Sequence, residues 1–120
     1  MRTVDELKQA LKTALTEAMR ARRKEIVSAL RETLAALDNA EAAELFEAPE
    51  MEHGVIAGGV KGLGAGEVAR KALSPEDAER VIEGELAERR SAAATFERLG
   101  RTDEAAMLRG QIEALEALLR

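Results

Sequence analysis

The stretch from Ser74 to the end of the chain carries every signal of a helical hairpin. Ser74 is a favourable N-cap residue, and Pro75 follows at the first helical position, where a missing N–H costs nothing. Gly100 stands where a helix C-terminus needs a left-handed residue, and Thr102 then begins another helix. The pattern predicts one helix from Ser74 to Gly100 and a second from Thr102 almost to Arg120.

Apolar residues recur at helical spacing within both of these segments. They are Val81, Ile82, Leu86, Ala93, Phe96 and Leu99 in the first segment, and Ala105, Leu108, Ile112, Leu115 and Leu119 in the second. The two stripes predict the buried faces along which the helices pack.

The first part of the chain predicts another hairpin. Thr3 and Glu6 have the spacing of a capping box, and apolar residues recur from Leu7 to Met19 and again from Ile26 to Leu37. We expect one helix from about Val4 to Arg22 and another from about Lys24 to Glu44. Because no glycine or proline marks the junction, a single bent helix is the alternative.

The segment between the hairpins, residues 46–73, is acidic at first and then rich in glycine. Six of the nine glycines fall between Gly54 and Gly66, and such density raises the entropic cost of regular structure. We therefore expect a single all-α domain over residues 1–120, a four-helix arrangement with the first hairpin at 1–45, a linker at 46–73 and the second hairpin at 74–120.

Composition narrows the class of protein further. With 34% charged residues and two aromatic ones, the core must be aliphatic side chains between well-solvated helices. The net charge of −5 argues against indiscriminate binding of nucleic acid. The absence of cysteine excludes disulfides, thiolate zinc sites and cysteine nucleophiles. Since no signal peptide or membrane-spanning run is evident, we expect a cytoplasmic protein.

Positive charge gathers at the predicted turn of the first hairpin. Arg20, Arg22, Arg23 and Lys24, with Arg31 one helical face away, form the best candidate for contact with a polyanion. The alternative is a solvated helix end, where cations face the negative end of the helix dipole.

Further candidates for partner binding lie in the second hairpin. Arg89 and Arg90 are close to Glu85 and Glu88, and Arg101 follows Gly100. These arginines could clamp a carboxylate or phosphate with two parallel hydrogen bonds. The alternative is ion pairing within the helix at spacings of three and four residues.

No catalytic, cofactor or metal site is predicted. His53 stands in the linker without the spaced partners that a metal site or a general base requires, so a solvated loop histidine is favoured over a ligand. The glycine segment lacks the Gly-Lys-Ser/Thr ending of a P-loop and reads as a linker.

The order of these motifs resembles the GatB/YqeY-like family. The string from Glu88-Arg89-Arg90 through Phe96-Glu97 and Gly100-Arg101-Thr102-Asp103 to Leu118 is similar to that family's hairpin, and Met19-Arg20-Ala21-Arg22 is similar to its basic first turn. The chain looks like an actinobacterial-type variant with a longer glycine-rich insertion. Since the sequence ends at Arg120, we expect a variant without the carboxy-terminal subdomain similar to the GatB tail.

The resemblance implies a connection with tRNA-dependent amidotransferases or with carbon-nitrogen ligation that uses glutamine as amido donor. In GatB the tail handles tRNA while the amide chemistry is done elsewhere in the complex. We therefore expect a helical module without catalysis of its own that contacts tRNA or a tRNA-modifying complex. The alternatives are a self-associating interaction protein, such as a homodimer, and an independent carbon-nitrogen ligase.

Overall fold

The structure, a computed structural model, describes residues 2–52 and 73–120, with side chains described over 2–43 and 73–120. These residues form four α-helices, α1 (Val4–Arg20), α2 (Lys24–Glu52), α4 (Pro75–Arg98) and α5 (Thr102–Leu118), and no strand. The predicted all-α fold is confirmed. Of the predicted linker at 46–73, residues 46–52 belong to α2, so the prediction is wrong there; residues 53–72, which include the six glycines and His53, lie outside the described residues.

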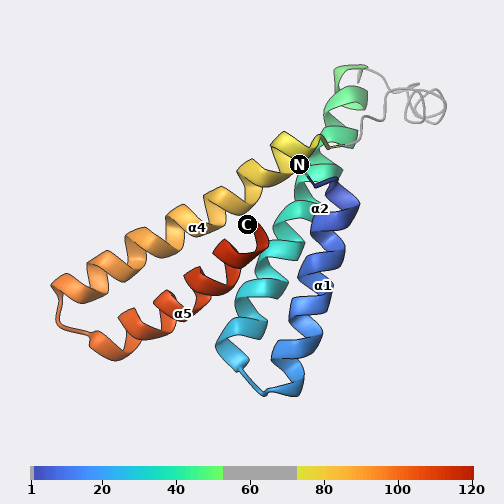
Figure 1. Cartoon of the computed structure of the whole chain (residues 1–120). Helices are drawn as coiled ribbons and strands as arrows, with labels where there is room; N and C mark the ends of the chain where they lie inside the picture. Colours follow the sequence, from blue (N-terminus) through green and yellow to red (C-terminus); the bar gives the residue numbers. More distant parts are fainter. Residues whose placement is uncertain (1, 53–72) are drawn as a thin grey trace.

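The helices are arranged as two hairpins (Figure 1). The helices α1 and α2 pack together in the first, and α4 and α5 make the most extensive pairing in the second. The first hairpin holds the second chiefly through α2, which contacts both α4 and α5. The end of the second hairpin at Gly100 extends away from the first, as Figure 1 shows.

The predicted caps form as the sequence indicates. The Glu6 N–H donates to Thr3 Oγ1 at 3.1 Å, and the Thr3 N–H donates to Glu6 Oε1 at 2.9 Å, which completes the capping box of α1. At the start of α4 the Asp77 N–H donates to Ser74 Oγ at 3.0 Å. Both helices therefore begin where their first backbone N–H groups find side-chain acceptors.

The two hairpin turns share one backbone motif. In the first turn the Arg23 N–H donates to the Ala18 carbonyl at 2.9 Å and the Arg22 N–H to Met19 at 3.1 Å. In the second turn Arg101 and Gly100 make the equivalent bonds at 2.8 and 3.1 Å. This is the Schellman pattern, whose first residue beyond the cap is left-handed.

That left-handed residue differs between the turns. It is Gly100 in the second turn, with φ of 75°, and Arg22 in the first, with φ of 59°. The left-handed turn ends α1 at Arg20, two residues before the predicted end at Arg22, and makes two helices instead of one bent helix. The helix α2 continues past its predicted end at Glu44 to Glu52; alanine, leucine and glutamate favour this extension, and it passes through Pro49, which does not.

The core is aliphatic and runs through all four helices. Its fully buried large members are Leu7, Leu11, Leu30, Leu37, Ile82, Leu86 and Leu115. Two residues of the predicted apolar stripes are exposed, Met19 by 50% and Leu99 by 64%. Each lies at a helix end beside a turn, where no further helix covers it. Phe96, predicted in the core, is half-buried and packs against it.

No helix in the described part of the chain combines the length and the apolar character needed to cross a bilayer.

Candidate functional site

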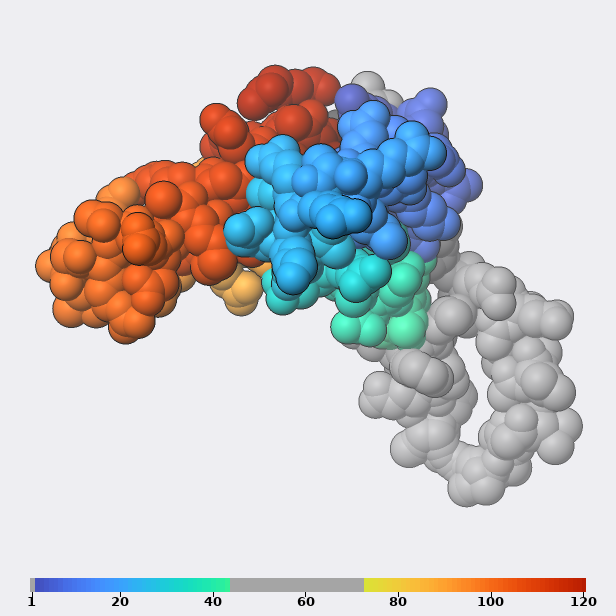
Figure 2. Space-filling model, turned by 90° about the horizontal axis from the view of Figure 1, so that it is seen from below, coloured from blue at the N-terminus to red at the C-terminus, as the bar shows by residue number. Residues whose placement is uncertain are grey.

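The predicted cations of the first hairpin lie around the turn between α1 and α2. We call Arg20, Arg22, Arg23, Lys24 and Arg31 the basic turn; all five side chains are exposed. The Schellman turn fixes the first four at the ends of two helices, and Arg31 stands two helical turns along α2. Figure 2 looks onto this end of the first hairpin, with the second hairpin extending to one side.

None of the five cations makes an ion pair with any side chain that the structure describes. By contrast, six cations elsewhere in the described ranges pair with carboxylates: Lys8, Arg80, Arg89, Arg90, Arg101 and Arg109. The basic turn is therefore a concentration of positive charge that the fold itself does not neutralise, on a chain whose net charge is −5.

Part of the basic turn surrounds an open groove with a volume of about 520 Å³. Arg22, Lys24 and Arg31 line it together with Met19 and Val27, and Ser28 and Glu32 complete the lining. Met19 is 50% exposed, so the groove has apolar surface as well as cations. The groove can thus offer an anionic ligand both charge and an apolar contact.

The other cations of the basic turn do not line this groove. Arg23 lines a smaller hollow of about 320 Å³ on the side of α5, with Glu113 and Arg120 among its neighbours. Arg20 is exposed on the last turn of α1. The structure therefore brings three of the five predicted residues to one concave surface and leaves two beside it.

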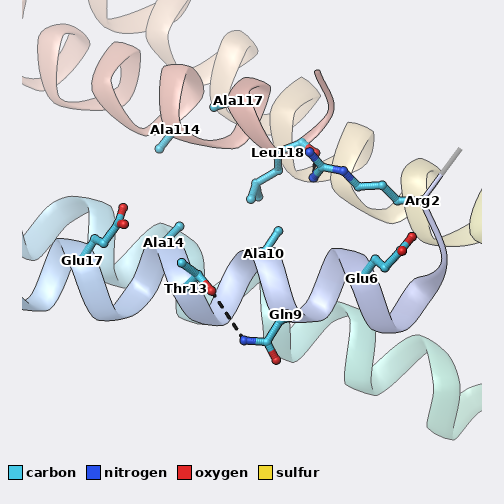
Figure 3. A pocket seen from close by; sticks show the side chains of 10 residues that line it. All are labelled: Arg2, Glu6, Gln9, Ala10, Thr13, Ala14, Glu17, Ala114, Ala117 and Leu118. Carbon is cyan, nitrogen blue, oxygen red and sulfur yellow. Dashed lines mark hydrogen bonds between the residues drawn. The ribbon is translucent and has the colours of Figure 1, made fainter.

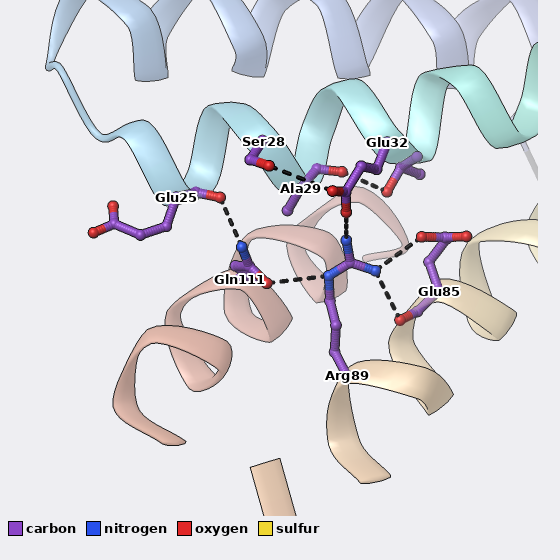
Figure 4. A network of polar contacts seen from close by, with 8 residues as sticks. Glu25, Ser28, Ala29, Glu32, Glu85, Arg89 and Gln111 are labelled. Atoms are coloured by element: carbon purple, nitrogen blue, oxygen red, sulfur yellow. Dashed lines mark hydrogen bonds and ion pairs between the residues drawn. The ribbon is translucent and has the colours of Figure 1, made fainter. Parts of the chain in front are cut away.

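Arg89 has a different place from the one expected of a partner-binding residue. It is buried, with 7% of its surface exposed, and its guanidinium bridges the hairpins (Figure 4). Nη1 donates to the Glu85 carboxylate at 2.8 Å and to the Glu85 carbonyl at 3.2 Å, and Nη2 pairs with Glu32 of α2. Arg89 is thus occupied within the fold, in the pairing within the helix that the sequence offered as the alternative to partner binding.

Gln111 of α5 extends the same network. Its Oε1 accepts a hydrogen bond from Arg89 Nε at 3.2 Å, and its Nε2 donates to the Glu25 carbonyl at 2.9 Å, as Figure 4 shows. No buried side-chain polar atom in the described ranges lacks a partner. The network therefore ties α2, α4 and α5 together and fixes how the hairpins meet.

The remaining two candidates pair within the second hairpin. Arg90 Nη2 donates to Glu116 at 2.9 Å. Arg101 pairs with Glu104, and its guanidinium lies 5.2 Å above the ring centre of Phe96. The hydrogen bond from Arg101 holds the pKa of the Glu104 carboxyl below its usual range. Both arginines are exposed, but each already has a carboxylate partner.

A second groove, of about 510 Å³, runs between α1 and α5 (Figure 3). Alanines at positions 10, 14, 114 and 117 line it from both helices, and Arg2 donates to the Leu118 carbonyl at one end at 2.8 Å. Its polar residues include Glu6 and Glu17, which do not converge on a common point in Figure 3. The groove offers shape but no arrangement of reactive groups.

Metal-binding clusters are likewise not found where the structure is described. No group of three histidine, aspartate or glutamate side chains gathers within residues 2–43 and 73–120. The groove at the basic turn joins three of the predicted site residues, Arg22, Lys24 and Arg31.

Sequence reasoning missed two features of this region. Met19 was assigned to the core, although its position in the last turn of α1 is a signal of exposure. Gln111 and the inward place of Arg89 were also missed. The signal for Arg89 is the spacing Ile82, Leu86, Arg89, Ala93, which puts it inside the buried stripe of α4.

Comparisons of the chain with protein-family models, with curated proteins and with solved structures found no match.

Proposed function

We propose that this protein is a helical binding module without catalysis of its own, and that its basic turn contacts RNA. The observation that supports the proposal is the exposure of five cations that make no ion pair with any described side chain, on a chain that is acidic as a whole. Unpaired arginine and lysine side chains release the counterions of a phosphate backbone when they bind it. A cytoplasmic RNA is the partner in this proposal.

The resemblance to GatB/YqeY-like proteins favours tRNA, or a tRNA-modifying complex, among the RNAs that such a surface could bind. The resemblance includes the basic turn itself, in Met19-Arg20-Ala21-Arg22. We propose that the chain is related to tRNA-dependent amidotransferases in this binding role, and not as an independent carbon-nitrogen ligase. A ligase would need an activated nucleophile beside a nucleotide site, and the cations of the basic turn account for binding without either.

Mobility-shift titration with tRNA at several salt concentrations tests the proposal. The test variant carries Arg22→Gln, Lys24→Gln and Arg31→Gln, and the matched control carries Arg80→Gln, Arg98→Gln and Arg109→Gln, which removes the same charge from exposed sites on the second hairpin. We expect the test variant to bind more weakly, with a salt slope lower by about 2 to 3 for three lost phosphate contacts. The control should bind almost as the original chain does.

Two results would refute the proposal. One is no binding of tRNA at low salt. The other is an equal loss in both variants, because that would show an effect of net charge and not of this surface.

A second candidate is self-association through the far end of the second hairpin. Leu99 is 64% exposed at the end of the second hairpin, and this end extends beyond the first hairpin. An exposed leucine at a projecting hairpin end becomes a contact between proteins where it joins a contiguous apolar patch on a second copy. Light scattering at micromolar concentrations decides this candidate, since a monomer throughout the range excludes it.

A further inference from the structure

The groove at the basic turn has two kinds of surface, and phosphate binding uses only one of them. Three cations, Arg22, Lys24 and Arg31, account for attraction to a phosphate backbone. They do not account for the apolar surface of Met19 and Val27 that lies in the same groove. An exposed methionine in the same groove as cations favours a ligand that has an apolar face as well as negative charge.

Paired and unpaired RNA differ in whether they expose the faces of their bases. A double helix presents phosphates, riboses and the edges of its bases, with the base faces stacked inside. An unpaired nucleotide also presents the face of its base, which stacks on apolar side chains and on arginine guanidinium planes. The groove is lined both by apolar side chains and by arginines, on which a base can stack. Its volume of about 520 Å³ lies in the range of small-molecule sites.

The one carboxylate in the groove does not cancel its positive charge. Glu32 lines the groove, but its Oε1 pairs with the buried Arg89, and its Oε2 accepts a hydrogen bond from Ser28 Oγ at 3.4 Å. Arg89 is thereby a positioning residue that holds the Glu32 carboxylate toward the interior network (Figure 4). The three cations of the groove remain available to phosphate.

We infer that the groove takes an unpaired nucleotide of RNA, with its phosphate on Arg22, Lys24 and Arg31 and its base against Met19 and Val27. This inference rests on the proposed function, and it narrows the class of ligand to single-stranded RNA or an unpaired loop. A duplex would gain binding energy only from contact between its phosphates and the cations, because its base faces are stacked inside.

Fluorescence anisotropy with two labelled RNAs tests the inference on the full chain. The RNAs are a single strand of about 12 nucleotides and a duplex with the same number of phosphates. The variants are Met19→Ala and, as a matched control, Met107→Ala, whose methionine is 41% exposed on the second hairpin. Both residues are exposed helix positions, so alanine preserves the fold.

We expect the single strand to bind more tightly than the duplex. Met19→Ala should weaken single-strand binding by about twofold to tenfold, the effect of losing one contact between a methionine sulfur and an aromatic ring. Its salt slope should be unchanged, since the slope counts phosphate contacts. Met107→Ala should bind as the original chain does.

Other outcomes would overturn the inference. If tRNA binds but the duplex binds as tightly as the single strand and Met19→Ala has no effect, then the inference fails and the proposed function stands. If polyglutamate displaces the single strand and its own binding is weakened by Met19→Ala, the groove takes an acidic peptide and the inference also fails. If no RNA binds, both proposals fail together.

Discussion

Arg22 occupies a backbone position that favours glycine, and this makes a sharp test of the first turn. Its φ of 59° matches the 75° of Gly100 in the equivalent turn. A side chain with a Cβ costs roughly 1–2 kcal/mol in this conformation. Replacing arginine with glycine removes that cost but restores about 0.4–1 kcal/mol of freedom to the unfolded chain. The variant Arg22→Gly should therefore be more stable by about 0.5–1 kcal/mol.

Gly100→Ala is the reverse experiment in the same motif. A Cβ added at Gly100 would meet no atom within 4 Å, so the change tests backbone conformation without a steric clash. We expect a loss of about 0.5–1 kcal/mol. Arg22→Ala should leave stability almost unchanged, because both residues have a Cβ.

Urea denaturation followed by circular dichroism measures all three variants on one scale. The reasoning fails if Arg22→Gly is less stable than the original chain, or if Gly100→Ala has no effect. Since Arg22→Gly also removes a cation of the groove, the proposed function predicts a protein that is more stable and binds tRNA less tightly. That combination would show that the Arg22 side chain contributes to binding while its backbone conformation costs stability.

Two further predictions concern the contacts between helices. Arg89→Ala should destabilise the fold by about 2–3 kcal/mol, because it leaves Gln111 and two carboxylates without their partner. Arg90→Ala, at an exposed ion pair, should cost less than about 1 kcal/mol. Equal losses of stability in urea denaturation would contradict this prediction. The hydrogen bond to Glu41 raises the pKa of Lys8 above its ordinary 10.5, so the stability that Lys8 contributes is complete below pH 10.5 and is lost as pH rises through the folded value. Between neutral pH and about pH 12, Lys8→Met should therefore lose less stability than the original chain, and the control Lys12→Met should behave as the original chain does. If stability falls with pH equally in Lys8→Met and the original chain, Lys8 does not have this role.

Much of the fold follows from local signals. The capping box at Thr3, the cap and proline at Ser74 and Pro75, and the left-handed Gly100 each specify a helix end within a few residues of sequence. Such interactions need only neighbours three to five positions away, so a linear sequence displays them. The helix ends at Arg20 and Glu52 were less well predicted, because an arginine at the left-handed position and a long run without glycine give weaker signals.

The candidate site likewise has one part that local sequence predicts and one part that depends on packing. The cluster of cations at the basic turn is visible in the sequence because four of them are almost consecutive. Arg89 is buried and Arg90 is exposed because of the face that α4 turns toward α2 and α5. Neighbouring residues on a helix point about 100° apart, so a rotation of α4 by one residue would bury Arg90 in place of Arg89.

The sequence by itself determined that the chain forms helical hairpins with a basic turn, since helix caps, left-handed residues and apolar periodicity act over a few residues. Only the tertiary structure decided that Met19 lies exposed in a groove with three of the cations, and that Arg89, Glu32 and Gln111 join the hairpins. Those relations involve residues up to 86 positions apart, as between Gln111 and Glu25, and only packing brings such residues within hydrogen-bond distance.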